Sequence, residues 1–315
     1  MTINQAQTVK ELHTIRDFIR FSMSQFYQYD IYFGHGTDNP WDEAVQLVLG
    51  ALHLPWSSDQ QLLDSRITSD EKRRVLEFLV QRVEQRRPLP YIIGEAWYAG
   101  LPFYVDERVL IPRSPVQEMI EQHFAPWFRE GPVERILDLC TGSGCIGIVC
   151  AYAFEEAEVD VADISGDALE VARRNIQRHE LTDRVHAVES DLFSNLTGRR
   201  YDLIVSNPPY VDKADLESMP DEYQHEPASG LIAGEDGLDI VVRLLRDAAL
   251  YLADNGILVV EVGYTHDALQ AQYPEVPFIW LDFEQGGTGV LLLQADRLVH
   301  YQEMFDRVAQ QRNVD

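Results

Sequence analysis

The stretch RILDLCTGSGCIG, residues 135–147, decides how this chain of 315 residues is interpreted. Its first six residues form a mostly apolar run, which predicts a buried β-strand. The glycines that follow, Gly142, Gly144 and Gly147, allow a sharp turn and bring backbone amides close to a ligand. A strand, a glycine-rich turn and a helix in this order are typical of α/β folds that bind nucleotide-like cofactors.

Six more strand candidates surround this stretch, and helical patterns separate the first five strands. Such alternation predicts a mostly parallel sheet with helices on both faces. The last two candidates lie only a few residues apart, which permits a hairpin and therefore one antiparallel strand at the end of the sheet. We predict an α/β fold with a seven-stranded Rossmann-like sheet. The other six candidates are EVDVADI (158–164), RVHAVES (184–190), YDLIVSN (201–207), GILVVEVG (256–263), FIWLDFE (278–284) and GVLLLQA (289–295).

The first 90 residues have a different character and are predicted to form a helical domain. Capping-box patterns begin at Thr8, Ser57 and Thr68, and the proline-rich segment 86–90 is expected to end the last helix. Residues 91–113 mix aromatic and β-branched residues with glycines and prolines, which predicts a β-hairpin linker. The sheet domain then spans residues 114–315.

The net charge of −26 bears on the partners of the protein. So many acidic side chains repel the phosphates of nucleic acids and attract a basic protein. No apolar run is long enough for a membrane span. The odd number of cysteines, three, argues against a disulfide framework and favours a cytoplasmic protein. Their spacing matches no zinc or iron–sulfur pattern, so no metal site is expected.

Aspartates at the ends of three successive strands indicate the cofactor. Asp163 is placed to accept hydrogen bonds from ribose hydroxyls, and Asp191 from an adenine amino group. Glycines alone fit NAD equally well, but Asp138 repels a pyrophosphate and attracts the ammonium and sulfonium groups of S-adenosylmethionine. We therefore expect S-adenosylmethionine to be bound by Asp138, Cys140, Thr141, Gly142, Ser143, Gly144, Asp163, Ile164, Asp191, Leu192 and Asn207.

The fourth strand ends in Asn207-Pro208-Pro209-Tyr210, which we call the tetrad. Its prolines stiffen the turn, so that the Asn207 side-chain oxygen and the Pro208 carbonyl form two neighbouring acceptors for a planar NH2 group. Tyr210 is suited to stack on that group. These four residues are the predicted catalytic residues of a nitrogen methyltransferase.

The motifs together resemble those of the HemK/Prm protein glutamine methyltransferases. The resemblance rests on LDLCTGSG (137–144), the tetrad, and Glu226-Pro227 followed by GEDG (234–237), and it extends over almost the whole chain. It implies a class I methyltransferase fold, a helical substrate-recognition domain, and methylation of a glutamine side-chain amide in another protein. The polar segment 211–237 is expected to shape the substrate side, with His225 in a structural role.

Two departures from the release-factor branch favour the ribosomal-protein branch, which acts on the third protein of the large subunit, uL3. Release-factor enzymes have IPRPDTE and GTGTG, whereas this chain has IPRSPVQE (111–118) and Cys140 in place of the first glycine. Three alternatives stay open at this point: a release-factor methyltransferase, a nucleic-acid adenine N6 methyltransferase, and a non-catalytic ribosome assembly factor.

Overall fold

The computed structural model describes residues 3–128, 132–212, 218–284 and 286–312. The chain divides into a helical unit, Met1–Ala96 with Pro220–His225, and a sheet unit, Trp97–Met219 with Glu226–Asp315. The chain therefore passes from one unit to the other three times. The sequence predicted an N-terminal helical domain, but it did not predict that residues 220–225 belong to the same unit.

The helical unit is built around an apolar core of helices. Phe18, Ile19, Leu47 and Leu79 are completely buried in this core. The helices are α1 (Gln5–Glu11), α2 (Ile15–Gln28), α3 (Pro40–Ala51), η1 (Gln60–Asp64), α4 (Ser69–Glu84), α5 (Leu89–Ile93) and η2 (Asp221–His225). Helix α5 begins where the sequence predicted an end, because proline is tolerated in the first turn of a helix, where its missing N–H is not needed.

One of the three predicted capping boxes is confirmed. The Thr68 side chain accepts a hydrogen bond from the third amide of α4, and the bond in the other direction is also present. The boxes predicted at Thr8 and Ser57 are wrong, because Asn4 and Asp59 cap α1 and η1 instead. The side chains of Asn4 and Asp59 accept hydrogen bonds from backbone amides that would otherwise be free at the starts of these two helices.

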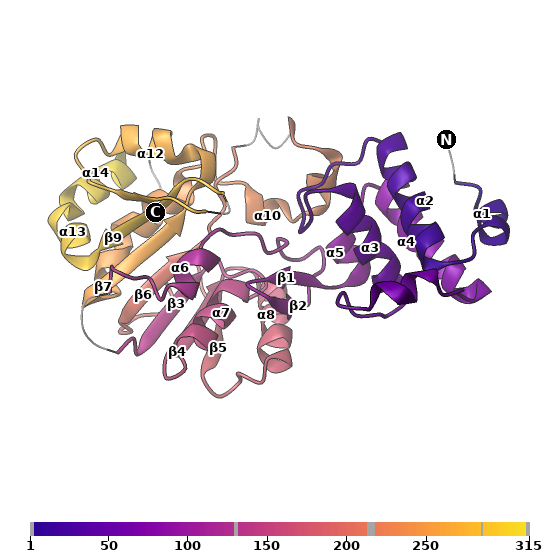
Figure 1. The fold of residues 1–315 in the computed structure, drawn as a ribbon. Coiled ribbons are helices and arrows are strands. Elements are labelled where there is room, and N and C mark those ends of the chain that lie inside the picture. The colour runs from indigo at the N-terminus through magenta and orange to yellow at the C-terminus, as the bar shows by residue number, and fades with distance from the viewer. Residues whose placement is uncertain (1–2, 129–131, 213–217, 285, 313–315) are drawn as a thin grey trace. The chain divides into compact units, whose positions relative to one another are not determined.

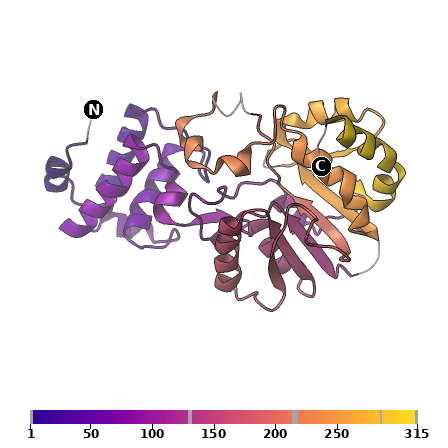
Figure 2. The ribbon, with the colours of Figure 1, turned by 180° about the vertical axis from the view of Figure 1, so that it is seen from behind.

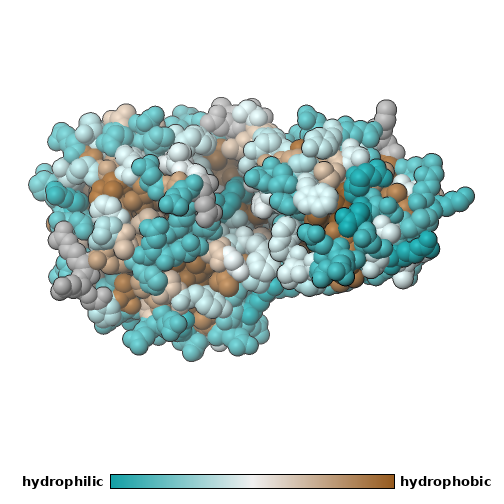
Figure 3. Space-filling view, in the orientation of Figure 1, coloured by the Kyte–Doolittle hydropathy of each residue, from teal (hydrophilic) through white to brown (hydrophobic). Residues whose placement is uncertain are grey.

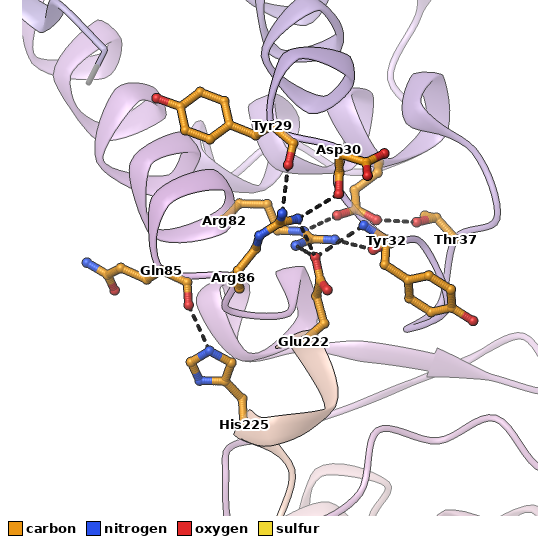
Figure 4. A network of polar contacts seen from close by, with 10 residues as sticks. Tyr29, Asp30, Tyr32, Thr37, Arg82, Gln85, Arg86, Glu222 and His225 are labelled. Atoms are coloured by element: carbon orange, nitrogen blue, oxygen red, sulfur yellow. Dashed lines mark hydrogen bonds and ion pairs between the residues drawn. The ribbon is translucent and has the colours of Figure 1, made fainter. Parts of the chain in front are cut away.

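A buried network of polar contacts holds η2 in the helical unit (Figure 4). The Glu222 carboxylate accepts hydrogen bonds from Arg82 (3.1 Å), Arg86 (3.3 Å) and the Tyr32 amide (3.2 Å). Arg82 also pairs with Glu43, and its guanidinium group is almost completely buried. The segment that follows the tetrad thus supplies a charge that the N-terminal helices need.

The sheet unit contains the predicted seven-stranded sheet, in the order β5-β4-β3-β6-β7-β9-β8. The strands are β3 (Arg135–Leu139), β4 (Glu158–Asp163), β5 (Val185–Glu189), β6 (Tyr201–Ser206), β7 (Leu252–Glu261), β8 (Ile279–Leu281) and β9 (Val290–Gln294). Strand β9 runs antiparallel to both of its neighbours, and the other described pairings are parallel. The predicted fold class, with one antiparallel strand near the end of the sheet, is confirmed.

Helices cover both faces of this sheet (Figures 1 and 2). Leu137, Leu139 and Ile204 pack against helices on one face, whereas Ile136 and Leu203 pack on the other. This alternation follows from the two-residue period of a strand. The helices of the sheet unit are α6 (Gln117–Glu121), α7 (Cys145–Ala153), α8 (Gly166–Arg178), α10 (Ala228–Leu231), α11 (Asp239–Asp247), η3 (Ala248–Leu250), η4 (Gly263–Thr265), α12 (His266–Gln272), α13 (Ala295–His300) and α14 (Gln302–Arg312).

A short two-stranded sheet lies in the predicted linker. It consists of β1 (Ala96–Tyr98) and β2 (Leu101–Phe103), joined by Ala99 and Gly100, which both have positive φ. Two positive φ angles are what a tight hairpin turn requires.

The space-filling view shows hydrophilic side chains spread over the visible face of each unit, with hydrophobic residues between them (Figure 3). Among the described residues, no helix is both long and apolar enough to cross a membrane.

Candidate active site

A cavity opens at the carboxyl ends of the central strands of the sheet unit. Both the glycine turn and the tetrad line it. Ligands of open α/β sheets bind at this edge because the turns after parallel strands meet there.

The glycine turn follows β3 and leads into α7. Cys140, Gly142 and Gly144 all have positive φ, at 56°, 55° and 81°. Cys140 takes this conformation although it replaces a glycine of the wider pattern, and it lines the cavity together with Thr141, Gly142 and Ser143. A Cβ atom on Gly147 would lie 2.4 Å from the Val161 side chain, so this glycine allows α7 to pack closely on β4.

Asp163, at the end of β4, fixes the turn from the neighbouring strand. Its two oxygens accept hydrogen bonds from the amides of Gly142 and Ser165, both at 2.9 Å. Each oxygen keeps a second lone pair for a ligand. Burial raises the pKa of this carboxyl above its ordinary value. Asp163 and Ile164 both line the cavity.

Asp138 lies beneath the turn and is completely buried. Its Oδ2 accepts hydrogen bonds from the Thr141 hydroxyl (2.5 Å) and the Gly147 amide (2.9 Å), whereas its buried Oδ1 has no partner among the described residues. An unpaired buried acceptor is costly, and a cationic group of a ligand would satisfy it. Asp138 does not itself line the cavity, so its predicted contact with the cofactor stays a prediction.

The predicted adenine contacts, Asp191 and Leu192, also lie outside the cavity lining. Asp191 forms an ion pair of 2.8 Å with Arg243, and Leu192 is buried in the core with a φ of 46°. Their predicted role in cofactor binding is therefore not supported by a cavity contact and stays a prediction.

The tetrad follows β6, directly beside the glycine turn. The Ser206 hydroxyl donates a hydrogen bond of 2.8 Å to the Leu139 carbonyl and thereby joins the ends of β6 and β3. All four tetrad residues line the same cavity as Gly142 and Ser143. The structure thus brings the two motifs together, as the sequence predicted.

Among the cavity residues that the sequence did not predict is Glu261, at the end of β7. It is buried and lines the cavity, and its carboxylate accepts hydrogen bonds from Tyr210 and Ser114. A single acidic residue in the apolar run LVVEV (258–262) was the signal for it.

An ion pair between Arg113 and Glu226 fixes another part of the cavity wall. Arg113 donates two hydrogen bonds to the Glu226 carboxylate, at 2.6 and 2.7 Å, and the Ile111 amide donates a third at 3.0 Å. Glu226 directly precedes the segment 227–231, of which four residues line the cavity: Pro227, Ser229, Gly230 and Leu231.

The polar segment 211–237 therefore contributes residues to both units. Its part from 227 to 231 borders the cavity, whereas 220–225 belongs to the helical unit. Residues 213–217 lie outside the described residues. His225 makes a structural hydrogen bond of 2.8 Å with the Gln85 carbonyl, as expected.

Comparison with known proteins agrees with this geometry. The methyltransferase small domain family matches residues 121–221. The ribosomal protein uL3 glutamine methyltransferase of Francisella tularensis is 50% identical over 307 residues, which are 97% of this chain and 98% of that protein. The protein of the same name from Bordetella pertussis is 46% identical over 290 residues, 92% of this chain and 97% of its own.

These relatives confirm the resemblance to the HemK/Prm group and the choice of the ribosomal-protein branch. They also leave no basis for an NAD oxidoreductase. The seven-stranded sheet is the Rossmann-like fold of class I methyltransferases. The chain belongs to the ribosomal protein uL3 glutamine methyltransferases, which are S-adenosylmethionine-dependent enzymes.

Proposed function

We propose that this protein methylates the side-chain amide nitrogen of a glutamine in ribosomal protein uL3. The observation that carries the proposal is the single cavity that both the glycine turn and the tetrad line. The relatives named above act on uL3 according to their names, and they match this chain along nearly all of its length.

The residues around the turn fit S-adenosylmethionine, which supplies an electrophilic methyl group when it is bound. We assign the ribose hydroxyls to the free lone pairs of Asp163 and the ammonium group to the unpaired Oδ1 of Asp138. The amides and glycines of 140–144 allow close approach of the rest of the cofactor. Asp191 and Leu192 are assigned to the adenine.

The tetrad is suited to activate an amide nitrogen, which is a poor nucleophile because its lone pair is shared with the carbonyl. The Asn207 side-chain oxygen and the Pro208 carbonyl accept the two N–H groups, and this draws electron density back onto the nitrogen. As the nitrogen becomes positive these two hydrogen bonds strengthen, so they favour the transition state over the substrate. The extra proton of the methylated nitrogen is acidic and leaves to water without a strong base.

The net charge supports a basic protein as partner and argues against a nucleic-acid substrate. We further propose that the reaction takes place in the cytoplasm, which the three free cysteines favour. If the substrate is basic, the KM for uL3 rises between 50 and 300 mM salt (about sixfold in ionic strength), whereas cofactor affinity changes little. A KM that is independent of salt contradicts this part of the proposal.

The central test is the variant Asn207→Ala. We expect methyl transfer to purified uL3 to fall by about 100-fold or more, since loss of one preorganised hydrogen-bonding group costs about that much. Cofactor binding, measured by calorimetry, should remain within a few-fold because Asp163 and the turn are unchanged. Unchanged methyl transfer to uL3 would contradict the proposed role of the tetrad.

Mass spectrometry of cells that lack the gene tests the substrate. One methyl group should be missing from a single glutamine of uL3. If a release factor loses the methyl group instead, the assigned substrate is wrong. Tight binding of the purified protein to free duplex DNA at moderate salt would favour the nucleic-acid alternative.

A further inference from the structure

Glu261 is a carboxylate without an assigned role in the cavity. It is the last residue of β7, its exposed fraction is 6%, and the four residues before it are apolar and buried. Burial of a charged group is expensive unless hydrogen bonds satisfy it. Its two oxygens have different partners: Oε2 accepts from the Ser114 hydroxyl at 2.6 Å, and Oε1 accepts from the Tyr210 hydroxyl at 3.1 Å.

The same strand end also supports the Tyr210 ring. A Cβ atom on Gly263 would lie 2.6 Å from the ring, so only glycine allows this close packing. The Tyr264 ring meets Tyr210 edge-on, with ring centroids 6.0 Å apart. A Cβ atom on Gly237 would lie 2.2 Å from the Tyr210 carbonyl, which confines the backbone too. Tyr210 is thus held at its hydroxyl, its ring and its backbone.

We propose that Glu261 is a positioning residue for methyl transfer, which orients Tyr210 through its hydroxyl while Ser114 fixes the carboxylate. This inference rests on the proposed function. The Tyr210 hydroxyl donates a hydrogen bond to the Glu261 carboxylate, and such a charge-assisted hydrogen bond enriches the ring in electrons. An electron-rich ring at a fixed angle stabilises the positive charge that develops on the substrate nitrogen, because rings attract cations through their faces.

Three single variants and one double variant test this assignment in the full chain. Glu261→Gln keeps the size and an acceptor but removes the charge, and Tyr210→Phe removes only the hydroxyl. Each is expected to lower the kcat for methylation of purified uL3 by about tenfold, with little change in the KM for uL3. The double variant should be no slower than either single variant, since both changes break the same hydrogen bond. Ser114→Ala, a smaller change, should lower kcat by about threefold.

The control is Glu118→Gln. Glu118 is also a buried carboxylate of the sheet unit and accepts a hydrogen bond from the Glu284 amide at 2.9 Å, but it does not line the cavity. Its variant should lose stability to heat without a change in kcat. Thermal unfolding of all variants separates a loss of folded protein from a loss of rate.

The outcomes distinguish this inference from the proposed function. If the wild-type protein transfers no methyl group to uL3, the proposed function is wrong. If the wild type is active and Glu261→Gln matches its kcat, or if the effects of Glu261→Gln and Tyr210→Phe multiply in the double variant, Glu261 does not act through Tyr210.

Discussion

The two oxygens of Asp138 have unequal surroundings, and this gives the residue a measurable pH dependence. Oδ2 holds the glycine turn through Thr141 and Gly147, whereas the buried Oδ1 has no partner in the part of the chain that the structure describes. Burial outweighs the two hydrogen bonds and raises the pKa of the carboxyl from 3.8 to about 7. The folded chain therefore binds this proton more tightly than the unfolded chain does.

Because of Asp138, the free energy of unfolding should decrease as the pH rises. Between the ordinary pKa of 3.8 and the folded pKa of about 7, only the folded chain holds the proton. The free energy of unfolding should therefore fall across this window by up to about 4 kcal/mol. Asp138→Asn, which cannot ionise, should unfold at a higher temperature than the wild type at pH 8. The difference should shrink at pH 5.

Thermal unfolding of the ligand-free chain at both pH values measures this effect. If Asp138→Asn is destabilised equally at pH 5 and pH 8, the negative charge of Asp138 is already compensated in the folded wild-type protein. The same variant should bind S-adenosylmethionine more weakly at pH 8, because the partner assigned to the ammonium group has lost its charge.

At the scale of elements, close packing of α7 on the sheet brings the glycine turn to its position. Gly147 lies in the first turn of α7, against Val161 of β4 and Asp138 of β3. Gly166 begins α8 and has ordinary room, because its added Cβ would meet Glu189 at 3.6 Å. The two helices thus offer a matched pair of glycines, one tightly packed and one not.

Gly147→Ala should therefore destabilise the sheet unit, whereas Gly166→Ala should not. Overpacking at Gly147 costs about 1–3 kcal/mol, and the new methyl group also presses on Asp138, so cofactor affinity should fall. Gly166→Ala gains helix propensity and should be neutral or stabilising by about 0.4–1 kcal/mol. Chemical denaturation and calorimetry measure both effects, and equal stability of the two variants would show that α7 can shift away from β4.

At the scale of the whole molecule, the chain between the tetrad and α11 joins the two units in an unexpected way. After the tetrad it enters the helical unit, where Glu222 neutralises Arg82 and Arg86 (Figure 4), and it returns with Glu226 to the cavity wall. Only three residues thus lie between two anchored carboxylates, Glu222 in the helical unit and Glu226 in the sheet unit. The helical unit is incomplete without this segment.

Glu222→Gln should weaken the helical unit. Among the described residues, Arg82 would then keep Glu43 as its one charged partner. Removal of one member of a buried ion pair costs about 3–5 kcal/mol. Hydrogen exchange should accelerate in α2 and α4 and stay unchanged in β3 and β6 of the sheet unit.

Asp221→Asn is the matched control, since Asp221 is the exposed neighbour of Glu222 on the same short helix. Exchange in α2 and α4 should match the wild type in this variant. If Glu222→Gln leaves exchange in α2 and α4 unaltered as well, the buried network does not stabilise the unit.

The sequence by itself determined the strands, the turn and the tetrad. Their signals are local: apolar runs, glycines after a strand, and prolines after an asparagine depend only on neighbours in the chain. The order of the parallel strands then placed residues 142–144 and 207–210 at one edge of the sheet. For the same reason the antiparallel strand near the sheet end was predictable from a short connection.

Only the tertiary structure decided which polar side chains meet. Glu261 and Ser114 are 147 residues apart, and Glu222 and Arg82 are 140 apart, so no local pattern pairs them. Asp138 and Asp191 follow the expected spacing, yet one is buried beneath the turn and the other pairs with Arg243. The choice of partner for a buried charge depends on the three-dimensional surroundings that must replace its water, and these exist only once the chain has folded.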